Sequence, residues 1–102
     1  MSLETVQQLY RDLAVAAQTM PNESAVMSMV TAFNDDLTEA QRMYPRHPLL
    51  SSLSQAQRQV PIIDLLTRTG RLQAILEEEE RKSRAEEAGR ANEVRRRQFG
   101  LG

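Results

Sequence analysis

His47 is the only histidine of this 102-residue chain, and it is the side chain best suited to acid–base chemistry near neutral pH. It lies between Arg46 and Pro48 in a proline-flanked segment, which predicts a loop. No second histidine and no cysteine accompanies it, which excludes the ordinary zinc ligand sets. No serine stands in a G-x-S-x-G elbow or beside a candidate base. We therefore interpret His47 as a solvated loop residue and predict that its replacement by alanine leaves the protein nearly unchanged.

Three carboxylates close together in the sequence, Asp35, Asp36 and Glu39, are a second group with chemical potential. Magnesium prefers oxygen ligands, and all-α pyrophosphohydrolases hold it with paired acidic motifs on two facing helices. Asp35 and Glu39 would lie one helical turn apart, and the glutamates of residues 77–80 offer a second set. That second set lies where the apolar face of its helix has ended, so a solvated acidic face is the preferred interpretation. A metal-dependent hydrolase is kept as the third-ranked function, with no catalytic, cofactor-binding or metal-binding residue assigned.

Arginine-rich segments make nucleic acid a possible partner. Twelve of the 13 basic residues are arginine, and two short segments are rich in them, residues 81–84 ("RKSR") and 95–97 ("RRR"). Arginine suits phosphate contacts, but affinity for a phosphate backbone depends on net positive charge. Residues 77–98 carry seven acids and seven bases, so the segment is neutral. Residues 62–76 could be forced into a helix-turn-helix with "RTG" as the turn, although a continuous helix explains the pattern without it.

The composition excludes several classes of protein. The net charge is −1, the apolar fraction is 40 %, and there is no cysteine for a disulfide or a thiolate site. No apolar run approaches the roughly 20 residues that span a bilayer, so no membrane partner and a cytoplasmic location are expected. The abundance of helix-forming residues predicts an all-α protein. Acids dominate residues 1–41 and arginines residues 42–76, a complementarity that favours packing of the two parts on each other or on a second copy.

Two apolar patterns with the strict heptad spacing of coiled coils predict the first pair of helices. The first covers residues 3–20 and the second runs from Val26 to Tyr44, with Asn22 as its expected N-cap. Pro21 separates the two helices, which predicts an antiparallel hairpin in which Val26, Val30, Phe33 and Leu37 face Val6, Tyr10 and Leu13. The internal methionines are expected to fill the core or to serve an adaptable interface: Met20, Met27, Met29 and Met43.

A third and a fourth helix complete the predicted antiparallel bundle of three to four helices. The apolar positions Leu49, Leu53, Ala56 and Val60 predict a short third helix of about eleven residues. Pro61 is expected at the first position of the fourth helix. Gly70 lies inside that helix, where it marks a kink, a helix end or a close approach of a neighbouring helix.

The apolar face of the fourth helix ends at Leu76 and a charged segment follows. Acids there precede bases by four residues in five pairs, each of which stabilises a helix by about 0.2–0.5 kcal/mol: Glu77–Arg81, Glu78–Lys82, Glu80–Arg84, Glu86–Arg90 and Glu93–Arg97. Residues 1–76 are therefore predicted to form the helical bundle. Residues 77–102 are predicted to form a charged helical extension that frays beyond about residue 88.

The sequence thus favours a non-enzymatic, helical protein–protein interaction module, either a homo-oligomer or an adaptor or subunit of a larger complex. Nucleic-acid binding through the arginine-rich C-terminal residues is the first alternative. No cofactor is expected, and no motif identifies the partner.

Overall fold

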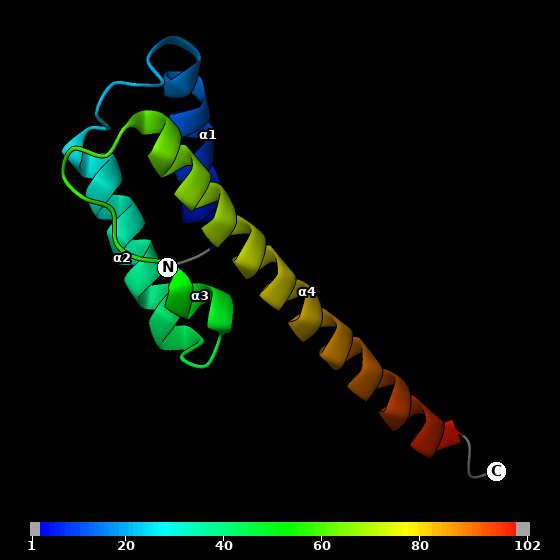
Figure 1. Ribbon diagram of the computed structural model, residues 1–102. Coiled ribbons are helices and arrows are strands. Elements are labelled where there is room, and N and C mark those ends of the chain that lie inside the picture. Colours follow the sequence, from blue (N-terminus) through cyan, green and yellow to red (C-terminus); the bar gives the residue numbers. More distant parts are fainter. Residues whose placement is uncertain (1–2, 100–102) are drawn as a thin grey trace.

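The computed structural model describes the backbone of residues 3–99 and the side chains of residues 3–89. Within these residues the protein is all-α, as predicted, with helices α1 (Leu3–Thr19), α2 (Met27–Met43), α3 (Pro48–Ser52) and α4 (Ile62–Phe99) (Figure 1). None of these helices is both long and apolar enough to cross a membrane. Helix α4 leaves the bundle after its first half and projects away from it, which makes the molecule 67 Å long but only 26 Å and 17 Å across.

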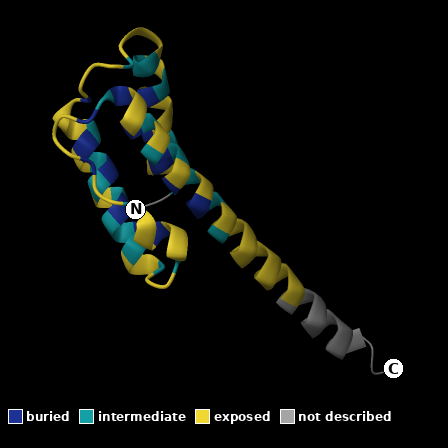
Figure 2. Ribbon diagram, in the orientation of Figure 1, coloured by how far each residue is buried: buried dark blue, intermediate teal, exposed yellow. Residues whose placement is uncertain are grey.

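The core lies where α1, α2 and the first half of α4 meet (Figure 2). Its largest fully buried side chains come from all four helices: Val6, Leu13, Phe33, Leu37, Leu50, Leu65, Thr69 and Leu72. The hydroxyl of Thr69 donates a hydrogen bond to the carbonyl of Leu65 at 2.7 Å, which satisfies this buried polar group within its own helix. The predicted burial of Val30, Phe33 and Leu37 is confirmed.

Helix α1 packs chiefly along α4, so the predicted α1–α2 hairpin is not the main packing unit. Gly70 lies at this contact, because a Cβ atom added there would stand 3.0 Å from the ring of Tyr10. Of the three alternatives for Gly70, the structure therefore shows the close approach of a neighbouring helix. Tyr10, which was predicted to face α2, lies at the edge of the α1–α4 contact with 36 % of its surface exposed.

The start of α2 differs from the prediction. The helix begins at Met27, and its N-cap is Val26 and not the predicted Asn22. Val26, which was predicted to be buried, is exposed. The reason is that residues 21–25 pair with the chain entering α4 through three backbone hydrogen bonds. The amides of Ala25, Ile62 and Ile63 donate to the carbonyls of Val60, Glu23 and Pro21 at 2.8, 2.8 and 3.0 Å. These distant bonds replace the helical ones.

The predicted third helix is also shorter than expected, with five residues in place of about eleven. The chain from Leu53 to Val60 is non-helical because side chains of α2 bind its backbone. The side-chain amide of Gln41 donates to the backbone carbonyls of Leu50 and Leu53 at 2.9 and 3.1 Å. Asn34 donates to the carbonyl of Ala56 at 3.1 Å and accepts from the amide of Ala56 at 2.7 Å. Ala56 and Val60 are nevertheless buried. The apolar pattern therefore identified core residues correctly, although these two residues are not in a helix.

Helix α4 begins at Ile62, one residue after Pro61, and runs without a break to Phe99. It contains no turn at "RTG", so the helix-turn-helix arrangement is wrong. It also continues past the point near residue 88 where fraying was predicted. The helix crosses the predicted boundary at residue 76 without interruption, and separate folding of residues 1–76 stays a prediction.

Candidate functional site

His47 is not the solvated loop residue that the sequence suggested. Its Nε2 atom lies 3.2 Å from Oε1 of Glu79, and only 15 % of the histidine side chain and 18 % of the glutamate side chain are exposed. Its Nδ1 atom accepts a hydrogen bond from the amide of Leu49 at 3.2 Å, which caps α3. The ring therefore holds the α2–α3 connection against α4. Nothing in the sequence spacing signalled this contact, because 31 residues separate the two partners.

Both ring nitrogens of His47 are thus used in structural contacts. The neighbouring hydroxyls of Ser51 and Ser52 donate to the carbonyls of His47 and Leu49 at 3.0 and 2.7 Å. Neither serine donates to the imidazole, so these residues lack the nucleophile–base hydrogen bond of a serine hydrolase. The arrangement builds a helix cap and a tether between two segments of the chain.

The tether predicts a measurable stability effect, which revises the expectation drawn from the sequence. His47→Ala should lower the free energy of unfolding by about 1 kcal/mol, because it removes an N-cap and the half-buried contact with Glu79. His47→Asn should lose less, because asparagine is a good N-cap but is too short to replace the contact with Glu79. Thermal and urea unfolding of the two variants would measure the difference. Equal stability of His47→Ala and the unsubstituted protein would contradict the tether.

The carboxylates of α2 do not gather around a common ligand position. Asp35 is exposed, while Asp36 and Glu39 are half-buried. Burial raises the pKa of the Asp36 carboxyl above its usual value, and the nearby carboxylates of Glu39 and Asp35 act in the same direction. Among residues 3–89, no group of three or more histidine or acidic side chains could hold a metal ion.

The four glutamates of residues 77–80 point in different directions and do not form one acidic surface. Glu77 faces α1, and its carboxylate accepts hydrogen bonds from Gln7 of α1 at 3.4 Å and from Gln73 of its own helix at 3.0 Å. Glu79 faces His47. Glu78 and Glu80 are exposed and pair with Arg81 and Arg84 of the same helix. The paired acidic motifs required by the hydrolase alternative are therefore not brought together.

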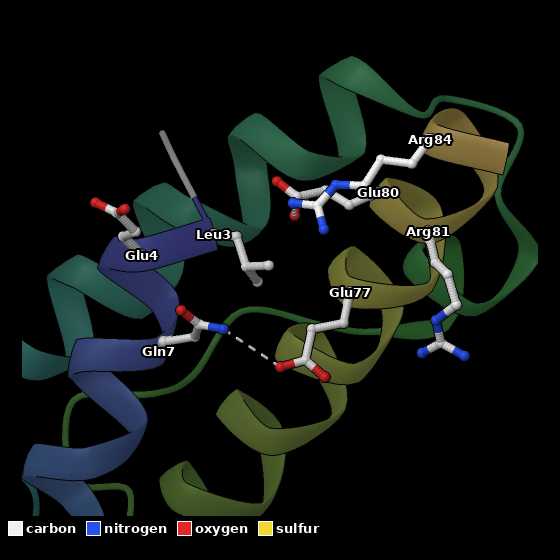
Figure 3. A pocket seen from close by; sticks show the side chains of 7 residues that line it. All are labelled: Leu3, Glu4, Gln7, Glu77, Glu80, Arg81 and Arg84. Atoms are coloured by element: carbon white, nitrogen blue, oxygen red, sulfur yellow. Dashed lines mark hydrogen bonds and ion pairs between the residues drawn. The ribbon is translucent and has the colours of Figure 1, made fainter. Parts of the chain in front are cut away.

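A polar crevice of about 620 Å³ lies between the start of α1 and the point where α4 leaves the bundle (Figure 3). Figure 3 shows Gln7 and Glu77 pointing toward one another across it, while the Arg81 side chain extends away. Its lining is Leu3, Glu4, Gln7, Glu77, Glu80, Arg81 and Arg84. Its acids outnumber its bases, and Glu80 pairs with Arg84 at 3.6 Å. The lining of the crevice includes no nucleophile and no histidine, and the crevice lies close to the point where α4 leaves the bundle.

From Glu80 to Gly89, α4 is exposed on every side. Residues 80–89 are all exposed, and a Cβ atom added at Gly89 would meet no atom within 4 Å. The bases of this part pair with acids of their own helix: Arg81 with Glu78 at 3.2 Å, Lys82 with Glu79 at 3.5 Å and Arg84 with Glu80 at 3.6 Å. A helix that is polar all round lacks a packed face, and such pairs are the local interactions that support it.

The predicted four-residue spacing of these pairs is correct only in part. Glu80–Arg84 forms as predicted. Arg81 and Lys82 instead pair with the acids three residues before them, Glu78 and Glu79. Glu77 accepts hydrogen bonds from Gln7 and Gln73 instead of pairing with Arg81. The predicted pairs Glu86–Arg90 and Glu93–Arg97, and the basic residues 95–97, lie outside the described side chains.

Comparison with known proteins adds no assignment. The chain matches no protein-family model, and neither a curated protein nor a solved structure matches it.

Proposed function

We propose that this protein is a non-enzymatic protein–protein interaction module, in which the helical bundle holds α4 and presents its charged half to a protein partner. The observation that carries the proposal is the exposure of residues 80–89, a helical segment that contributes nothing to the core. A helix that is polar all round commonly bridges between domains or subunits. The bundle positions it firmly, because Gln7 and His47 bind Glu77 and Glu79 at the point of exit.

A protein partner fits the described charges better than nucleic acid does. Arg81, Lys82 and Arg84 each have an acid of the same helix within 3.6 Å. Such bases are partly neutralised, whereas binding to a phosphate backbone depends on cations that replace the condensed counterions. Alternating charges on a helix instead suit the polar rim of a protein interface, where they set orientation and partner choice.

The test is site-specific photocrosslinking in the cells that produce the protein naturally. A photoreactive residue replaces Ser83 in the projecting half of α4, and Gln18 serves as the control because it is also exposed but lies on α1. Discrete protein adducts are expected at position 83 and not at position 18. Adducts that nuclease treatment removes would favour the nucleic-acid alternative. Absence of adducts at position 83, or equal adducts at both positions, would contradict the proposal.

A further inference from the structure

One surface of the bundle is apolar without being covered. A groove of about 360 Å³ separates α3 from α4, and it is lined by Leu49, Ser52, Leu53, Arg71, Ala74 and Ile75. Leu49 projects at its edge with 59 % of its surface exposed. The exposed Leu49, the half-buried Leu53 and Ala74 all line this groove, so its apolar lining is open to solvent.

The α4 side of this groove continues into a line of charges. Asp64, Arg71, Ala74, Glu78 and Lys82 are all exposed, and their spacing places them along one side of α4, away from α1. We refer to these five residues as the outer face. Glu77 lies on the α1 side of the helix, because its carboxylate accepts a hydrogen bond from Gln7 of α1 and it lines the α1–α4 crevice.

The charges of the outer face are complementary to those of a second copy that lies antiparallel to it. Along the helix its charges read negative, positive, negative and positive, with the small residue Ala74 between Arg71 and Glu78. If a second copy of α4 lies antiparallel across Ala74, Arg71 of each copy faces Glu78 of the other. Asp64 then comes within about one helical turn of Lys82, and a lysine side chain can span that offset. A parallel pair would instead place Arg71 against Arg71 and Glu78 against Glu78.

Arg71 and Asp64 are available for such contacts. Neither forms an ion pair with another residue in the described part of the chain, although both border a polar hollow beside α3. Within their own helix, Glu78 pairs with the exposed Arg81 at 3.2 Å, and Lys82 pairs at 3.5 Å with Glu79, which is half-buried. Exchange of such surface pairs for partners on a second copy requires little free energy.

We propose that the outer face and the α3–α4 groove bind a second copy of this chain, giving an antiparallel dimer with twofold symmetry. Ala74 allows the two helices to approach closely, Leu49 and Leu53 of each copy cover the seam, and two Arg71–Glu78 pairs set the register. A twofold interface closes on itself, because the same residues meet on both copies. The two projecting halves of α4 then point in opposite directions. This inference rests on the proposed interaction function and names one partner for it.

Charge reversal tests the proposal with the full-length chain. Sedimentation velocity over a concentration series should show a reversible dimer, with a dissociation constant in roughly the micromolar-to-millimolar range because the face is small and polar. Arg71→Glu and Glu78→Arg should each weaken the dimer roughly tenfold or more, because each turns two attractive pairs into two repulsive ones. The double variant should restore dimerisation. Arg11→Glu makes the same charge change on the exposed surface of α1 and should have no effect.

Three results would overturn the dimer. The first is a protein that remains monomeric at about 1 mM. The second is a dimer that the single charge reversals leave intact, and the third is a double variant that stays as weak as the single ones. Circular dichroism would verify that each variant is folded, which exposed substitutions should allow. A monomeric protein that still crosslinks through position 83 would refute the dimer and leave the proposed interaction function standing.

Discussion

Phe33→Ala should lower the free energy of unfolding by about 3–5 kcal/mol, because it empties the centre of the core. The ring of Phe33 lies there with 0 % of its surface exposed. Its removal takes away the transfer free energy of the ring and leaves a cavity that the surrounding helices fill only in part. Small domains are stable by only about 5–15 kcal/mol, so much of the stability would be lost. Urea unfolding monitored by circular dichroism measures the change.

Val26→Ala is the matched control for this experiment. Val26 stands seven residues before Phe33, in the same predicted apolar pattern, but 57 % of its surface is exposed. Its truncation should therefore change the free energy of unfolding by no more than about 0.5 kcal/mol. If the two truncations had similar effects, the start of α2 would be packed as the sequence pattern suggested and not as the structure shows.

Asn34→Ala should have the next-largest effect, about 1–3 kcal/mol. The side-chain amide of Asn34 both donates to and accepts from the backbone of Ala56, and Ala56 is buried. Without it, a buried amide and a buried carbonyl of the non-helical segment lose their partner. The free energy of unfolding and the hydrogen-exchange protection of the Ala56 amide should both fall.

Asn34→Asp and Gln55→Ala serve as controls for this contact. Asn34→Asp has nearly the same shape but places a carboxylate against the carbonyl of Ala56, so it should also destabilise the protein. Gln55→Ala removes only an exposed hydrogen bond to Thr38 and should be nearly neutral. Unchanged exchange at Ala56 in Asn34→Ala would show that the segment is held by other contacts.

Much of the fold was predictable because apolar spacing reports which side of a helix is buried. The pattern in residues 3–20 predicted α1 to within one residue of its observed end, and the prolines at positions 21 and 61 marked real boundaries. The change from apolar to charged residues after Leu76 lies a few residues before the point where α4 becomes exposed, because Glu77 and Glu79 still contact the bundle. These features depend on local composition and on periodicity.

The site could not be predicted in the same way. The bonds from Asn34 to Ala56 and from His47 to Glu79 join residues 22 and 32 positions apart, and no short-range pattern encodes them. The outer face was overlooked for a different reason. Its residues read as ordinary surface positions until the structure places Leu49 and Leu53 beside Ala74 and Ile75.

By itself, the amino-acid sequence determined the helical class, the position of most core residues and the charged character of the second half of α4. It did so because helix propensity, 3.6-residue periodicity and charge act over a few neighbouring residues. Only the tertiary structure decided that α1 pairs with α4, since that choice depends on the close approach that Gly70 allows beside Tyr10. It also decided that residues 53–60 and 21–25 are not helical, because backbone and side-chain groups distant in the chain satisfy their hydrogen bonds. A segment with helix propensity does not become helical where a group distant in the chain forms hydrogen bonds with its backbone and apolar surface is buried at the same time.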